Sequence, residues 1–117
     1  MLKPMILKIN NENIELTYSF RINVYFEQIT NHSIDFNNFT ANDLLNLFYC
    51  TVYATLQKAK KPVISMNDFL DIIDDNGGDK CLLKFSNWFI ETMKAEYSIE
   101  DAEDVKEVKQ DPSKKKN

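Results

Sequence analysis

Few side chains in this sequence could support catalysis or hold a metal ion. His32 is the single histidine of the 117 residues, and neither cysteine lies near it in the chain. A zinc site needs several nitrogen, sulfur or oxygen ligands around one position, and a Ser-His-Asp triad would need this same histidine near a nucleophile elbow. Neither pattern is present, so we interpret His32 as a solvated loop residue. The sequence predicts no catalytic residue, no metal ligand, no cofactor and no enzymatic activity.

An acidic run is the best candidate for binding a cation. Its members are Asp71, Asp74, Asp75 and Asp79. An EF-hand loop needs oxygen ligands at alternate positions, a central glycine and a closing glutamate. No register that starts at Asp71 or Asp75 supplies this pattern, so we interpret the run as the solvated face of a helix followed by a turn. The adjacent pair Gly77-Gly78 lacks the flanks of a phosphate-binding loop and is interpreted as a helix stop.

Tyr49, Tyr53 and Trp88 are the candidate partner-binding residues. They lie off the main apolar stripes of the two helices predicted to carry them. Tyrosine and tryptophan are enriched in protein interfaces. The alternative is that the three rings contact a second layer of the core. The sequence leaves both interpretations open.

The charge balance argues against nucleic acid as a partner. The formal net charge is -4 and the pI is about 4.9, whereas nonspecific binding to phosphate needs a basic footprint. No apolar run approaches the roughly 18 residues that a membrane-spanning helix needs. The apolar stretch at the N-terminus is too short for a signal peptide. We therefore expect no nucleic-acid partner, no membrane association and a cytoplasmic location.

The two cysteines, Cys50 and Cys81, lie inside apolar helical patterns. Free cysteine behaves as a small apolar residue and is often buried. We therefore expect two buried thiols in a reducing compartment, where disulfides are rare.

Periodicity predicts a hairpin followed by helices. Residues 5–18 alternate in the manner of two strands, with an asparagine-rich turn over residues 10–13. The spacing of apolar residues then predicts four helices, at about residues 19–30, 41–60, 66–76 and 79–97. The helix over 41–60 is apolar around much of its circumference, so we expect it to be central.

Residues that favour helix ends support these boundaries. Ser19, Thr40 and Ser65 are predicted N-caps, and Asp43 and Asp68 follow the last two by three residues, as in a capping box. The predicted fold class is α+β, predominantly α, with an N-terminal β-hairpin packed on a bundle of about four helices. Residues 1–97 are expected to form a single globular domain, and residues 98–117 a charged, flexible, disordered tail.

The order of these elements resembles a known family. A hairpin leads into a helix that begins Ser19-Phe20-Arg21, followed by the stretch Phe39-Thr40-Ala41-Asn42-Asp43-Leu44. The segment Pro62-Val63-Ile64-Ser65-Met66-Asn67-Asp68 then opens a short acidic helix, and an aromatic-rich helix closes the domain. From Met5 to about Lys94 the chain resembles the tail assembly chaperones of long-tailed bacteriophages and prophages.

This resemblance implies a non-enzymatic protein that binds the tape measure protein. Members of the family bind apolar helical segments of that protein in the bacterial host cytoplasm before the tail tube polymerises, and the family fixes no contact residues. A homo-oligomer is compatible with the sequence. The alternatives are a structural virion protein or mobile-element adaptor, and a small regulatory domain that binds nucleic acid.

Overall fold

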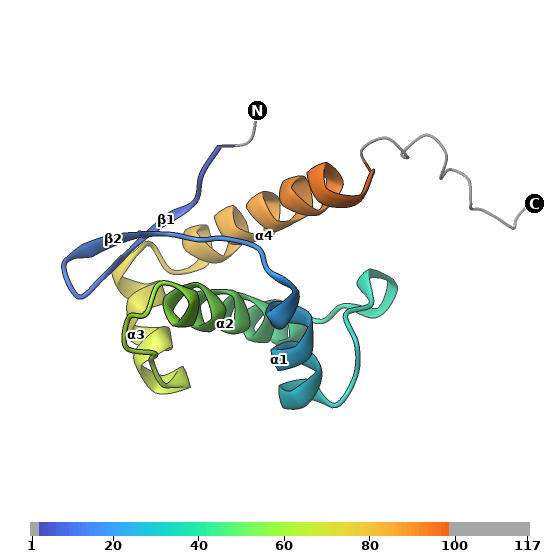
Figure 1. The fold of residues 1–117 in the computed structure, drawn as a ribbon, viewed down its shortest axis with the longest axis horizontal. Helices are drawn as coiled ribbons and strands as arrows, with labels where there is room; N and C mark the ends of the chain where they lie inside the picture. Colours follow the sequence, from blue (N-terminus) through green and yellow to red (C-terminus); the bar gives the residue numbers. More distant parts are fainter. Residues whose placement is uncertain (1–2, 99–117) are drawn as a thin grey trace, which may run out of the picture.

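The computed structural model describes residues 3–98, so the tail predicted for 98–117 lies outside the described residues except for Ser98. An antiparallel hairpin precedes four α-helices, and the predicted α+β, mainly helical class is confirmed (Figure 1). The helices are α1 (Phe20–Thr30), α2 (Ala41–Lys58), α3 (Met66–Asp75) and α4 (Asp79–Met93). Two short turns complete the fold, the 3-10 helix η1 (Phe36–Asn38) and the π-helical η2 (Lys94–Ser98).

The hairpin consists of β1 (Ile6–Ile9) and β2 (Glu12–Glu15). Its turn takes only Asn10 and Asn11, with φ angles of 52° and 65°. A two-residue hairpin turn with both residues in the left-handed region matches the twist of the strands, and asparagine tolerates that region. The predicted turn over residues 10–13 was therefore two residues too long, because β2 begins at Glu12.

Alternation along the hairpin buries one face against the helices. The buried side chains are Met5, Leu7, Ile9, Ile14 and Leu16. Two helix-borne side chains also bond the outer edges of the strands. The Asn76 amide accepts from the Lys8 backbone N–H and donates to the Lys8 carbonyl, both at 3.1 Å. Just beyond the end of β2, the Thr17 N–H donates to the Thr55 hydroxyl at 3.2 Å.

Helix α2 lies in the middle of the molecule, as predicted, with the hairpin and α4 on one side of it and α3 on the other (Figure 1). The capping box at its start is present: the Thr40 hydroxyl accepts from the Asp43 N–H, and the Asp43 carboxylate accepts from the Thr40 N–H. In the core, the Phe48 ring stacks on Phe85 with the ring centroids 4.2 Å apart. Such ring contacts hold α2 and α4 together.

The helix ends follow the predicted signals, with small shifts. The Ser65 hydroxyl accepts from the Asp68 N–H, as predicted. At the end of α3, Gly78 donates its N–H to the Ile73 carbonyl and Gly77 has a φ of 117°, so the glycine pair does form the stop. Helix α2 ends two residues before the predicted position because Lys60 adopts a left-handed φ of 63°.

Two features of the helices differ from the expected pattern, although Ser19 is the N-cap of α1 as predicted. Ser19 occupies the N-cap of α1 but makes no capping hydrogen bond with its side chain. Helix α4 ends at Met93, and the last residues of its predicted range form the wider η2 turn. Among residues 3–98, no helix combines the length and the apolar character that crossing a bilayer would require.

Candidate protein-binding groove

An apolar groove of about 470 Å³ opens between η1, the first turns of α2 and the C-terminal half of α4. These elements meet on the right-hand side of Figure 1. The groove is lined by Phe36, Phe39, Leu44, Leu47, Ser86, Phe89, Ile90, Met93 and Lys94. Only Ser86 and Lys94 of this set carry a polar group. We call this feature the apolar groove.

One wall of the apolar groove is aromatic and is positioned by η1. The Asp35 carboxylate accepts from the Asn37 N–H at 3.0 Å, which caps the 3-10 turn. This turn places Phe36 with its ring centroid 5.1 Å from that of Phe39 and 6.4 Å from that of Phe89. Aromatic contacts at these distances are favourable, so the wall is a packed cluster.

The opposite wall is one face of α4. Ser86, Ile90 and Met93 follow helical spacing, and Leu83 extends the same face by one turn. Several apolar side chains here remain in contact with solvent: Leu83 is 63% exposed, Phe36 53% and Ile90 44%. Exposed apolar side chains grouped around a groove are typical of surfaces that bind other proteins.

His32 and Asp43, which do not line the groove, connect two of the segments that do. The His32 Nε2 lies 3.2 Å from the Asp43 carboxylate, which is buried and also caps α2. The His32 ring additionally meets the Phe26 ring edge-on, with centroids 5.5 Å apart. His32 is half exposed, as expected of a loop residue, but it is not merely solvated. It ties the loop that carries η1 to the start of α2.

The structure brings two of the three predicted partner-binding residues together. Tyr49 and Tyr53 lie one helical turn apart on α2, with ring centroids 5.9 Å apart, and line a cavity of about 350 Å³ together with Tyr25. The Tyr49 hydroxyl donates to the Ile64 carbonyl at 2.8 Å. Burial raises the pKa of Tyr49, and the neighbouring Tyr53 raises it further. The hydrogen bond from Tyr49 to Ile64 holds the loop before α3 against α2.

Trp88 lies apart from the two tyrosines. It lines a separate cavity of about 340 Å³, on the side of α4 that faces Pro4 and Met5. Its ring centroid lies 6.0 Å from that of Phe85 and 6.3 Å from that of Phe89. The three predicted residues therefore do not form one continuous patch.

The residues of the apolar groove were missed by sequence reasoning. Phe36 and Phe39 lie in a stretch without helical or strand periodicity, where a search for amphipathic faces detects nothing. Leu83 and Ile90 could have indicated this groove, because both are apolar and lie off the apolar stripe of α4 that is expected to face the core. Two large aromatic residues in a mostly polar loop were a second signal.

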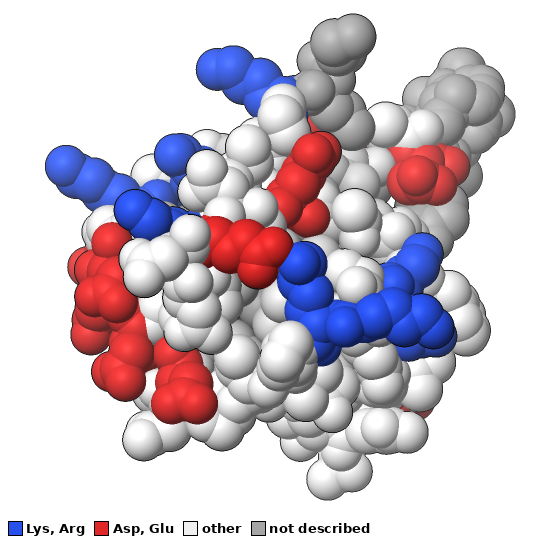
Figure 2. All heavy atoms as spheres, turned by 60° about the vertical axis from the view of Figure 1, so that its left-hand side comes forward, with Lys and Arg blue, Asp and Glu red and all other residues white. Residues whose placement is uncertain are grey.

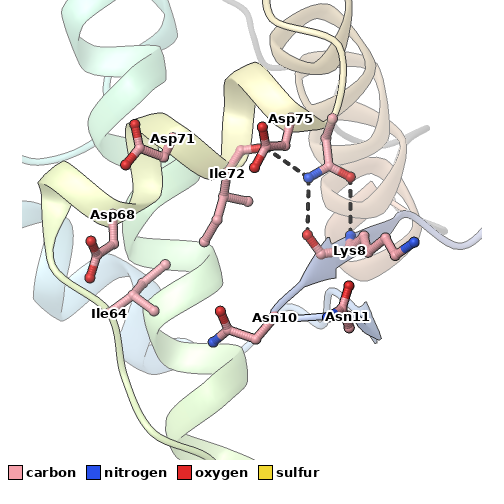
Figure 3. A pocket seen from close by; sticks show the side chains of 9 residues that line it. Lys8, Asn10, Asn11, Ile64, Asp68, Asp71, Ile72 and Asp75 are labelled. Atoms are coloured by element: carbon pink, nitrogen blue, oxygen red, sulfur yellow. Dashed lines mark hydrogen bonds between the residues drawn. The ribbon is translucent and has the colours of Figure 1, made fainter.

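A polar cleft lies on the other side of the molecule, between the hairpin turn and α3 (Figure 3). Its volume is about 470 Å³. Three aspartates of α3 face it, Asp68, Asp71 and Asp75, opposite Lys8 and the turn asparagines. Figure 2 shows a group of acidic side chains at the lower left of the view, and acidic and basic side chains next to one another across its centre. Within residues 3–98, no three His, Cys, Asp or Glu side chains come together in a metal-binding arrangement.

Both cysteines are free and buried, as predicted. Burial raises the pKa of the Cys50 thiol to about 12. Burial also raises the pKa of Cys81, although the nearby Lys84 charge opposes this shift. A thiol that keeps its proton is a poor nucleophile, so neither side chain is placed for thiol chemistry.

The candidate site is therefore an open, largely apolar groove built by η1, α2 and α4. Its walls are held in place by aromatic packing and by the His32–Asp43 pair. Comparison of the chain with protein-family models, with curated proteins and with solved structures found no match.

Proposed function

We propose that this chain is a non-enzymatic tail assembly chaperone of a long-tailed phage or prophage. In this proposal the apolar groove binds apolar helical segments of the tape measure protein before the tail tube polymerises. The observation that supports binding is the exposure of Phe36, Leu83 and Ile90 around a groove with few polar groups. The resemblance described above suggests the partner.

The shape and chemistry of the groove suit an amphipathic helix. Helix-in-groove recognition places apolar side chains at positions i, i+3 or i+4, and i+7 of the bound helix into an apolar channel. The face of α4 from Leu83 to Met93 spans three helical turns, so it is long enough for several such anchors. Covering a fully exposed apolar side chain contributes roughly 1.5–3 kcal/mol. A few anchors would therefore support a reversible complex.

Co-expression with the tape measure protein of the same phage or prophage tests the proposal. We expect the tape measure protein to become soluble and to co-purify with this chain. The variant Ile90→Glu should weaken the complex about tenfold or more, because it puts a carboxylate into an apolar contact. The matched control is Val63→Glu, which changes an exposed apolar residue that does not line the groove.

Two results would contradict the proposal. One is that the tape measure protein stays insoluble and no complex forms. The other is a complex that Ile90→Glu and Val63→Glu affect equally, since the contact would then lie elsewhere. Recovery of the chain from purified virions would instead identify it as a structural component, because an assembly chaperone is absent from the finished tail.

A further inference from the structure

The outer edge of β2 has backbone groups that the fold leaves open. In an antiparallel pair, alternate residues direct their N–H and C=O groups toward the partner strand. Leu16 donates its N–H to the Met5 carbonyl at 2.9 Å, which places Leu16 among the residues that face β1. By alternation Ile14 also faces β1, whereas Asn13 and Glu15 direct their backbone groups outward.

The pairing on β1 confirms this assignment. Lys8 is the register partner of Asn13. Its N–H and C=O groups are both bonded to the Asn76 side chain, on the side away from β2 (dashed lines at Lys8 in Figure 3). The Lys8–Asn13 pair is therefore the kind in which both residues point their backbone groups away from each other.

Within residues 3–98, the fold closes the outward backbone groups of Lys8 and Thr17, but not those of Ile6 on β1 or of Asn13 and Glu15 on β2. On β1, Asn76 occupies the outward groups of Lys8. Beyond the end of β2, the Thr55 hydroxyl bonds to both the N–H and the C=O of Thr17. Within residues 3–98, no hydrogen bond engages the outward groups of Asn13 or Glu15. Open strand edges are templates for pairing with another strand.

A shallow groove of about 350 Å³ runs beside this edge. One side is the strand, which carries the acidic side chains of Glu12 and Glu15, and the other is the end of α2, which carries Lys58 and Lys61. Glu12 and Lys61 already pair at 2.6 Å. Within the described residues, Glu15 and Lys58 have no partner of opposite charge. The surface therefore carries both signs and is complementary to itself.

We propose that this edge pairs with the same edge of a second copy of the chain. The two β2 strands run antiparallel about a two-fold axis at Ile14 and join the hairpins into a sheet of order β1-β2-β2-β1. A two-fold interface requires a self-complementary surface, and the acidic strand beside the basic end of α2 meets this requirement. This interface uses none of the residues that line the apolar groove, so it does not depend on the proposed function.

The hydrogen-bonding pattern selects one register. With the axis at Ile14, Asn13 of each copy lies opposite Glu15 of the other, and all the outward N–H and C=O groups of both residues are bonded. An axis at Asn13 would leave the Glu15 groups opposite a turn residue. An axis at Glu15 would place two like charges opposite each other, which is destabilising, and would oppose Asn13 to the already bonded Thr17.

Sedimentation velocity over a series of protein concentrations tests the dimer. We expect a monomer–dimer equilibrium in the wild type. Asn13→Pro removes one edge donor from each copy and should weaken the dimer about tenfold or more. The matched control Asn13→Thr keeps the N–H and should retain the dimer. Circular dichroism and thermal unfolding establish that each variant is folded.

Charge exchange tests the complementarity separately. Lys58→Glu should weaken the dimer, and the double variant Lys58→Glu/Glu15→Lys should recover it. Lys84→Glu changes the net charge equally but lies on α4, away from this edge, so the dimer should persist.

Hydrogen exchange on the wild type keeps the proposal testable if the proline variant does not fold. The amides of Asn13 and Glu15 should become protected as the protein concentration rises. The Ile14 amide, which bonds within the hairpin, should be protected at every concentration. The proposal would be overturned if the protein stayed monomeric throughout the concentration series. It would also be overturned by a dimer that neither protects the Asn13 and Glu15 amides nor weakens in the Lys58→Glu variant.

Discussion

The imidazole of His32 lies between two oxygen acceptors, with its Nε2 3.2 Å from the Asp43 carboxylate and its Nδ1 2.9 Å from the Ser33 carbonyl. The Asp43 carboxylate meanwhile accepts the Thr40 N–H. One carboxylate thus serves both the start of α2 and the loop that carries η1.

Replacing either member of this pair should destabilise the protein. We expect His32→Ala to lower the free energy of unfolding by about 1 kcal/mol, through the loss of its partly exposed contact with the Asp43 carboxylate. Asp43→Ala should cost about 2 kcal/mol, because it also removes half of the capping box. Urea denaturation measures both.

The double variant His32→Ala/Asp43→Ala provides the check on this coupling. If the two residues interact, the double variant should lose less stability than the sum of the single variants. Strict additivity would mean that the pair contributes nothing to stability.

Removing the Asn76 side chain should loosen the hairpin. Asn76→Ala loses both hydrogen bonds to the Lys8 backbone and leaves two strand groups without a protein partner. We expect a loss of about 2 kcal/mol in thermal unfolding experiments. Asn67→Ala is the control, since Asn67 is exposed on α3 and makes no side-chain hydrogen bond within the described residues. Equal effects of the two substitutions would show that the bonds to Lys8 are not important.

Thr92→Val should stabilise the protein. The Thr92 hydroxyl is buried and finds no hydrogen-bond partner within residues 3–98. Burying a hydroxyl without a partner is unfavourable, so replacing it with a methyl group should raise the free energy of unfolding by about 1 kcal/mol. Thr51 is the contrasting case, because its buried hydroxyl donates to the Leu47 carbonyl at 2.8 Å. Thr51→Val should therefore not raise the free energy of unfolding. Chemical denaturation of both variants measures the two changes.

The Cys50 thiol should make stability fall in alkaline solution. Its pKa is raised from the ordinary value of 9.0 to about 12 by burial. Above pH 9 the unfolded chain loses this proton while the folded protein keeps it. Deprotonation therefore stabilises the unfolded state relative to the folded state, and the free energy of unfolding falls. The contribution of the Cys50 thiol to the free energy of unfolding is fully present below pH 9 and is lost as the pH rises toward 12.

A Cys50→Ala variant isolates this titration from those of other groups. Its stability should be lower at neutral pH, because the substitution leaves a cavity. Its decline with rising pH should be shallower than that of the wild type. Parallel declines in denaturant midpoint would rule out a buried, neutral Cys50.

Elements set by neighbouring residues were predictable, and contacts between distant segments were not. The capping box of Thr40 and Asp43, the glycine stop after α3 and the alternation of the hairpin all act over a few residues, so the local pattern reveals them. The His32–Asp43 pair depends on how a loop folds back, which no local pattern records.

The candidate site shows the same division. Tyr49 and Tyr53 come together because helical spacing alone places residues four apart on one face. Trp88 is on another helix, where it packs against Phe85 and lines a cavity apart from the tyrosines. The groove wall formed by Phe36 and Phe39 needs a 3-10 turn, whose few residues leave no periodic signal.

The bond between Asn76 and the Lys8 backbone has a consequence for biosynthesis. The two residues are 68 positions apart, and the ribosome makes the strand first. While α2 and α3 are being translated, the Lys8 edge has no Asn76 to cover it, and an uncovered edge invites mispairing with other nascent chains. The emergence of the α3–α4 turn from the exit tunnel is thus the moment at which this strand edge becomes protected.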